Sequence, residues 1–294
     1  MEQKLFKQCG LLRMTDGGKS RLFKVRNVCG DTFEVEALPY LTEPQSILKV
    51  YPEANLIVTK DTLFTLDGKI MRQHNKENIS IEPVNDEWII LSDSLLDNDT
   101  RFQITFWDGT KERDYIWGRH LIKNDKYFAV YTSGDKRWLV YLRDGTLIVD
   151  VNNAETDMKI CGNFCVALGI GAHSAYSLLP QKSILAEEHC IFQKQQLILC
   201  SNYADFALCA NLQGMVQTYY CGKFSDFGQA TMVDLYDEAG LFSICRNGRY
   251  FLYRFNGEPF AENICPCGAD SVAYDKDDNT VLIDTNGVFR IIRL

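Results

Sequence analysis

The sequence predicts an all-β protein built from repeated antiparallel units, and three observations lead to that prediction. Short runs rich in Val, Ile, Leu, Phe and Tyr recur along the chain and often alternate with polar residues, as in "RYFLYRF" and "RFQITFW". Such alternation is typical of strands that bury one face. Turn dipeptides with Asp or Asn before glycine separate the runs. These turns also return at a nearly constant interval along the chain.

The stretch 127–150, "YFAVYTSGDKRWLVYLRDGTLIVD", shows the unit as strand, polar gap, strand, tight turn and strand. The corresponding stretches align on eight turn positions: Gly30, Gly68, Gly109, Gly145, Lys182, Gly214, Gly257 and Gly287. The spacings between these positions run from 30 to 43 residues, and one period of roughly 37 residues fits them all. We expect the turn glycines to adopt positive φ in two-residue hairpin turns.

Several short strands in each period of about 40 residues predict a β-propeller. Seven or eight blades are compatible with the turns, because the first and last units are incomplete and strands within 1–40 could close the ring with 271–294. The prediction is a single domain over 1–294. An open β-solenoid is the main rival, although its parallel strands would not need a tight hairpin in every unit. The best candidate for a helix, 184–197, has an ambiguous pattern.

The segments "YFAVYTSGDKRWLVYLRDGTLIVD" and "LFSICRNGRYFLYRFNGEPF" resemble the WG-type repeats of bacterial proteins. Those repeats pair an apolar strand and a polar turn with an aromatic strand and an Asp-Gly turn. The likeness extends over 55–294, but the Trp-Gly dipeptide itself occurs once, at Trp117-Gly118, outside the equivalent position. The resemblance implies a repeat scaffold for binding and supplies no catalytic residues.

The net charge of −8 disfavours a nucleic-acid partner. The charge is uneven, because residues 1–26 carry seven Lys and Arg against two acidic residues. This basic segment is either a solvated strand face or a docking patch.

Cysteine usage predicts a reducing, cytoplasmic environment. The chain has 11 cysteines, and four of them lie in apolar runs where reduced, buried thiols are expected: Cys165, Cys200, Cys209 and Cys245. The start, "MEQKLFKQCG", lacks the apolar region of a signal peptide. No run of eighteen apolar residues predicts a membrane span, so no membrane association is expected.

Neither the cysteines nor the acidic runs match a metal motif. Cys161 and Cys165 fall in a different unit from Cys265 and Cys267, and neither pair has the spacing of a zinc site. The sequence therefore predicts no metal.

The histidines give no catalytic motif, and the acidic runs do not match a calcium-binding motif. His173 precedes Ser174 in "GIGAHSAYS", but no Gly-x-Ser-x-Gly element supports a nucleophile there. The acidic runs at 93–100 and 275–280 do not follow the spacing of a calcium loop and are expected to be solvated hairpin loops. We therefore predict no catalytic residues and no cofactor.

The distribution of tryptophan suggests one surface for a partner. All four tryptophans lie within 88–138, and Trp88 and Trp138 are expected in the core. An exposed group of Trp, Tyr and Arg has the usual composition of a protein-binding hot spot. The candidate binding residues are Trp107, Tyr115, Trp117, Arg119 and His120. Packing between blades is the alternative interpretation of these side chains.

The favoured function is a non-catalytic module that binds another protein. One concrete version is a bacterial immunity or antitoxin-like protein whose acidic surface covers a basic toxin. One alternative is a propeller hydrolase or lyase with a site in the central channel, assembled from several blades. The other is a lectin for a small ligand or glycan, which should repeat an aromatic residue in each unit. The position four residues before the turn glycine is instead mixed and favours core packing: Phe64, Thr105, Tyr141, Ala210, Tyr253 and Ile283.

Overall fold

A computed structural model of the 294-residue chain gives the fold. It describes residues 1–29, 32–73, 78–84, 87–96, 99–132, 135–152, 157–179, 181, 183–260 and 268–294. Within the strands, the side chains of 78, 93–96, 99–101 and 113–115 are outside this description.

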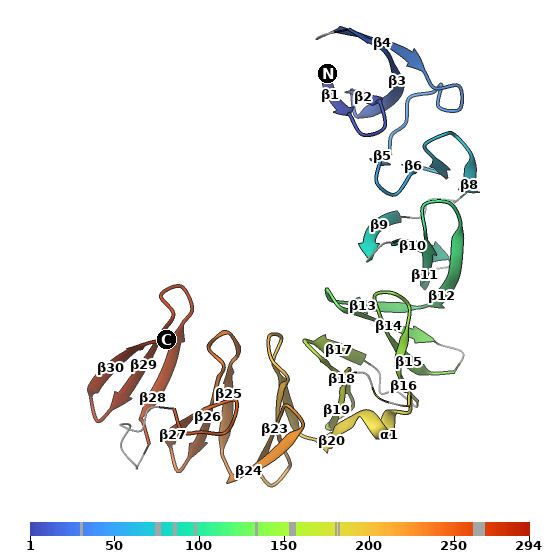
Figure 1. Ribbon diagram of the computed structural model, residues 1–294. Coiled ribbons are helices and arrows are strands. Elements are labelled where there is room, and N and C mark those ends of the chain that lie inside the picture. The colour runs from blue at the N-terminus through green and yellow to red at the C-terminus, as the bar shows by residue number, and fades with distance from the viewer. Residues whose placement is uncertain are drawn as a thin grey trace. The chain divides into compact units, whose positions relative to one another are not determined.

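The described residues form eight sheets in which strands adjacent in the sheet are also consecutive in the sequence (Figure 1). The first three sheets contain β1 (Glu2–Phe6), β2 (Leu11–Asp16), β3 (Lys19–Cys29) and β4 (Thr32–Ala37); β5 (Leu48–Tyr51), β6 (Leu56–Thr59), β7 (Thr62–Thr65) and β8 (Ile70–Gln73); and β9 (Asn78–Val84), β10 (Glu87–Leu96), β11 (Asp99–Trp107) and β12 (Glu112–Gly118). Paired strands in these sheets run antiparallel.

The remaining sheets repeat this arrangement. They contain β13 (His120–Lys123), β14 (Tyr127–Thr132), β15 (Arg137–Leu142) and β16 (Leu147–Val151); β17 (Asp157–Cys161), β18 (Phe164–Leu168), β19 (His173–Ser177) and β20 (Cys190–Gln195); β21 (Leu197–Cys200), β22 (Phe206–Ala210), β23 (Met215–Tyr220) and β24 (Lys223–Gln229); β25 (Met232–Tyr236), β26 (Leu241–Arg246) and β27 (Arg249–Arg254); and β28 (Ser271–Asp275), β29 (Thr280–Thr285) and β30 (Val288–Arg293). The prediction of an all-β protein made of antiparallel units is confirmed.

Helical structure within the described residues is short. The ambiguous segment 184–197 contains the single-turn helix α1 (Ala186–His189), after which the chain continues as strand β20. A 3₁₀ turn, η1 (Asp237–Ala239), follows β25. In the part of the chain that the structure describes, neither element has the length or hydropathy of a membrane-crossing helix.

The chain forms two compact units. One consists of Met1–Leu121, Val130–Ser133 and Arg143–Gly145, and the other of Ile122–Ala129, Gly134–Leu142 and Thr146–Leu294. The single domain over 1–294 stays a prediction, as does the closure of a ring by 1–40 with 271–294.

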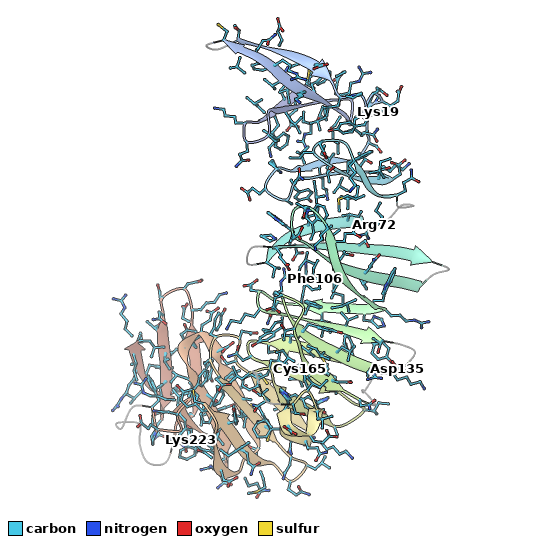
Figure 2. The ribbon with its side chains drawn as sticks, turned by 45° about the vertical axis from the view of Figure 1, so that its right-hand side comes forward. Lys19, Arg72, Phe106, Asp135, Cys165 and Lys223 are labelled. Carbon is cyan, nitrogen blue, oxygen red and sulfur yellow. The ribbon has the colours of Figure 1, made fainter. Side chains whose placement is uncertain are left out.

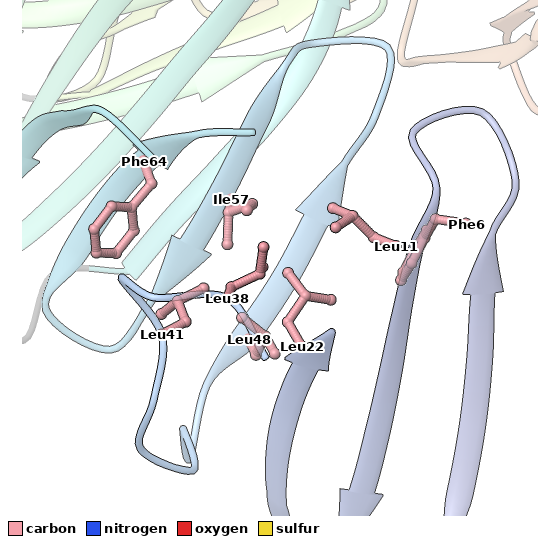
Figure 3. Packing of buried hydrophobic residues seen from close by; sticks show 8 residues of the cluster. All are labelled: Phe6, Leu11, Leu22, Leu38, Leu41, Leu48, Ile57 and Phe64. Atoms are coloured by element: carbon pink, nitrogen blue, oxygen red, sulfur yellow. The ribbon is translucent and has the colours of Figure 1, made fainter. Parts of the chain in front are cut away.

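Sheets inside each unit bury apolar side chains on both faces. Strand β6 is buried along its whole length, and its residues alternate between two clusters. Ile57 joins the cluster with the preceding sheet, which Figure 3 shows, whereas Leu56 and Val58 join the cluster with the following sheet. Because successive strand residues point to opposite faces, a continuous apolar run is the sequence pattern of a strand covered on both sides.

The same alternation occurs in the second unit. In β22, Phe206 and Leu208 face the cluster with β25–β27, while Ala207 and Cys209 face the cluster with β17–β20. Cys209 therefore packs as an apolar side chain between two sheets.

The predicted turn glycines have the expected backbone conformation. Six of them have φ between 74° and 93°: Gly68, Gly109, Gly145, Gly214, Gly257 and Gly287. The other two predicted turn positions, Gly30 and Lys182, lie outside the described residues. Positive φ explains why glycine recurs at these points, since side chains with a Cβ are disfavoured there.

The length of these turns differs from the prediction in several units. The Thr65 amide donates to Lys69 O and the Gly68 amide to Thr65 O, both at 2.9 Å, so the loop contains three residues. A three-residue loop that ends in a left-handed glycine is the next most common hairpin connection. The two-residue turn occurs at Asn286-Gly287, where both φ values are positive, at 53° and 77°.

The expected burial of the four cysteines in apolar runs is confirmed, whereas the reducing, cytoplasmic environment stays a prediction. Cys165, Cys200, Cys209 and Cys245 are all buried and free (Cys165 is labelled in Figure 2). The position four residues before the turn glycine is also largely buried, as core packing requires, at Phe64, Thr105, Tyr141 and Ile283.

Candidate functional site

The candidate binding residues that the structure places at the surface lie where β12 passes into β13. Trp117 is 51% exposed and stands opposite Gln103 of the neighbouring strand β11. Arg119 and His120 follow it and are also exposed. A half-exposed indole next to a guanidinium and an imidazole combines apolar area with hydrogen-bond donors.

Gly118 fixes the path of the chain at this point. A Cβ at Gly118 would overlap the side chain of Val130 and come within 2.9 Å of Tyr131 O. The Arg119 amide donates to Tyr131 O at 2.9 Å, which ties the connection to β14. Only glycine permits this close approach, so Trp117 and Arg119 project from an anchored segment of backbone.

Tyr131 completes this group and was not among the predicted residues. Its ring lies 5.8 Å from the ring of His120, centroid to centroid, at an angle of 45°. Tyr131 follows the strand run "YFAV", so the sequence marks it as part of a strand and gives no sign that it meets His120. We refer to Trp117, Arg119, His120 and Tyr131 as the β12–β13 surface; all four belong to the first unit.

A charged network borders the same face of the sheet. Arg72 of β8 donates to Gln103 Oε1 at 3.2 Å and lies 2.7 Å from a carboxylate oxygen of Glu112. Gln103 is directly opposite Trp117, so the two side chains share one face. Arg72 lies 31 residues before Gln103, and no local pattern in the sequence connects them.

Trp107 is a core residue and does not belong to the exposed group. Its side chain is 2% exposed, and Nε1 donates to Ala54 O at 2.7 Å. It packs with Leu56 and Ile90 between two sheets. The interpretation of Trp107 as an exposed binding residue is therefore corrected in favour of the packing alternative, because the indole turns inward and its single donor is satisfied there.

The predicted binding residue Tyr115 is described only through its backbone. It pairs with Thr105 in the register of β11 and β12. Its side chain lies outside the described part of the structure.

The structure separates the two residues that suggested a nucleophile and a base. His173 and Ser174 are consecutive in β19, so their side chains point to opposite faces of the sheet. The Ser174 hydroxyl is buried and accepts a hydrogen bond from the Lys194 amide at 3.2 Å. This geometry does not allow His173 to remove a proton from Ser174.

The residues considered as metal ligands do not converge within the described chain. Among the described residues, no group of three or more His, Cys, Asp and Glu side chains could hold a metal ion. Cys265 and Cys267 fall outside the described residues, as do the side chains of the acidic run 93–96 and 99–100. In the other acidic run, Asp275 accepts hydrogen bonds from the Asp277 and Asp278 amides, as in a side-chain-stabilised turn.

No protein family model matches the sequence, and no curated protein matches it either. Solved structures of Hsv2 from Kluyveromyces lactis are similar in part. One is 10% identical, covers 74% of this chain and 73% of its own, and has a TM-score of 0.36. Another, in which loop 6CD is replaced by a Gly-Ser linker, is 6% identical, covers 99% of this chain and 97% of its own, and has a TM-score of 0.33.

Proposed function

We propose that the protein is a β-propeller that binds another protein without catalysis. The first support is the succession of eight meander sheets. Sheets inside each unit have apolar clusters on both faces. An array of this kind needs a cover for its first and last faces, and ring closure supplies one.

The first and last sheets each have one exposed apolar face. On the first sheet, Phe33 and Val35 of β4 are exposed and lie on the same face. Val25 of β3 is directly opposite Val35 and shares this face. On the last sheet, Leu282 is opposite Ile291, which is 73% exposed. The eight separate sheets of the described chain favour the eight-bladed alternative over the seven-bladed one.

The observation that carries the binding function is the β12–β13 surface. Trp117 presents about half of its indole to solvent on a backbone that Gly118 anchors, so its apolar area is available to a partner. Trp and Arg are the residues most enriched in binding hot spots, and Trp117 and Arg119 lie two residues apart on the segment anchored through Gly118. With a net charge of −8, a basic protein is the favoured partner, as in an immunity or antitoxin-like complex.

A comparison of captured proteins tests this function. Immobilised wild-type protein and the W117A/R119A double variant would be incubated with lysate of the source organism, and bound proteins quantified by mass spectrometry. We expect at least one protein to be retained by wild type and reduced about tenfold or more on the double variant.

Tyr203→Ser provides the matched control, because Tyr203 is an exposed aromatic residue of the other unit. The control should retain the same protein as wild type. Equal capture by wild type and the double variant would contradict a role for the β12–β13 surface in binding.

A further inference from the structure

A groove at one end of the first sheets combines cationic and aromatic side chains. Its volume is about 550 Å³, and it is bounded by Lys4 and Lys7 near the β1–β2 turn, Tyr51 at the end of β5 and Trp88 at the start of β10. All of these residues belong to the first unit. The groove is therefore assembled from three consecutive sheets within one compact unit.

The aromatic wall of the groove is held by the core. Tyr51 and Trp88 are partly buried and pack against the cluster that contains Leu56 and Trp107. The Trp88 backbone pairs with Trp107 on one side and Pro83 on the other. These two aromatic rings thus offer apolar area whose position is set before any ligand binds, which lowers the entropic cost of binding.

The cations that line the groove are accessible to solvent. Lys4 and Lys7 are exposed, and neither forms an ion pair with any residue that the structure describes. The Lys4 ammonium lies 5.2 Å from the centre of the Phe6 ring. One carboxylate, that of Glu53, also lines the groove, so positive charge is in excess there while the whole chain is negative.

We propose that this groove binds an extended acidic peptide segment of a partner protein. Carboxylates of the segment would pair with Lys4 and Lys7, and one of its apolar side chains would lie against Tyr51 and Trp88. The combination matches the features that distinguish such a segment: several negative charges around an apolar anchor.

The groove is separate from the β12–β13 surface and does not depend on its function. In the third sheet, Trp88 and Glu112 are both next to Trp107, at the end where β12 begins. Trp117 is near the other end, where Gly118 pairs with Phe102. The two sites lie at opposite ends of the same strands, so a failure of one leaves the other testable.

Fluorescence anisotropy with a defined probe tests the proposal. The probe is a fluorescein-labelled peptide of glutamates around one phenylalanine, titrated with the full-length protein. We expect saturable binding that weakens about tenfold or more in K4E/K7E and weakens as salt is added. Binding should also change the tryptophan emission of wild type and leave that of W88F nearly unchanged.

The matched control is K19E/K24E, because Lys19 and Lys24 belong to the same basic segment but do not line the groove. It should bind the probe within about twofold of wild type. If the probe were attracted to the basic segment in general, K4E/K7E and K19E/K24E would lose affinity equally, and that result would overturn the proposal. Absence of binding to the glutamate peptide would also overturn it. So would equal binding of single-stranded oligothymidylate, which carries charge without the peptide anchor.

Discussion

The backbone of Gly145 lies against the aromatic ring of Phe106. A Cβ added at Gly145 would stand 2.6 Å from Phe106 Cζ, well inside normal contact (Phe106 is labelled in Figure 2). Gly145 also has a φ of 89°. The Asp144-Gly145 turn is thus constrained twice, by its own backbone conformation and by the side chain that packs against it.

We expect Gly145→Ala to destabilise the protein by about 3 kcal/mol, since positive φ costs roughly 1–2 kcal/mol and the overlap with Phe106 adds about 1–3 kcal/mol. Gly109→Ala is the matched control, because Gly109 has a φ of 93° and nothing within 4 Å of the added Cβ. Urea unfolding of both variants measures the difference. Equal losses of stability would show that Phe106 gives way at no cost.

The same relationship recurs at Gly68, where an added Cβ would overlap the ring of Tyr40, whose hydroxyl donates to Leu66 O at 2.6 Å. The sequence predicts both glycines as turn positions, because a dipeptide of Asp and Gly after a strand run is a local signal. It could not locate Tyr40 or Phe106 as their partners. The Phe106 contact joins two sheets, and the Tyr40 contact joins a turn to the connection between β4 and β5, so both are set by tertiary packing.

Substitutions at the two tryptophans of the predicted site should change the stability of the protein by very different amounts. Trp107→Phe leaves the buried Ala54 carbonyl without its donor and a gap in the cluster, which should cost about 2–4 kcal/mol. Trp117→Ala removes a half-exposed side chain and should change stability by no more than about 0.5 kcal/mol. Chemical denaturation of each variant decides the matter, and a large loss in Trp117→Ala would mean that its indole is structural.

This contrast marks the limit of what the sequence predicts about the candidate site. Both tryptophans lie at or near the end of a strand run with polar neighbours, so local pattern does not distinguish inward from outward side chains. Register decides it: Trp117 is opposite the polar Gln103, whereas Trp107 is opposite Trp88 over an apolar cluster. Tyr131 and Arg72 reach the site through pairings between distant segments, which no single stretch of sequence encodes.

The buried thiols should be inert in the folded protein. Burial raises the pKa of Cys209 to about 12 and that of Cys200 well above its ordinary value, so almost no reactive thiolate forms at pH 8. Exposed Cys29 and Cys221 should react with iodoacetamide first. Peptide mass spectrometry after timed alkylation gives the order, and equal rates for Cys209 and Cys221 in native protein would contradict the burial.

Removing His189 should destabilise the second unit. The ring is 1% exposed, and its two nitrogens lie 2.7 Å from Ser177 O and 2.8 Å from Ser183 O. His189→Phe keeps the bulk but removes the ring N–H that donates to one of these carbonyls, and leaving a buried acceptor without its donor costs about 1–3 kcal/mol. His189→Gln retains an amide donor and should lose less. Thermal unfolding of the two variants ranks them, and equal losses would show that volume alone matters.

Asp108 should make the turn before β12 sensitive to acid. Its carboxylate accepts from the Thr110 hydroxyl at 2.7 Å and from the Thr110 and Lys111 amides at 2.8 and 2.9 Å. These bonds, that of the Thr110 hydroxyl first, lower the pKa of Asp108 from 3.8 to about 2. Because the folded-state pKa is the lower one, the stabilisation is complete above about pH 4 and disappears as the pH falls towards 2.

Asp108→Asn should therefore be less stable than wild type at pH 5, and the difference should shrink at pH 2.5. Thr110→Val removes the hydrogen bond that lowers the pKa of Asp108 most and keeps the charge of the carboxylate. In this variant the loss of stability in acid should therefore begin nearer pH 4 than in wild type. Urea midpoints measured across this pH range test both expectations. The difference in urea midpoint between wild type and Asp108→Asn could instead stay constant from pH 5 to pH 2.5. That result would mean that the stability of the turn depends on the shape of the Asp108 side chain and not on its charge.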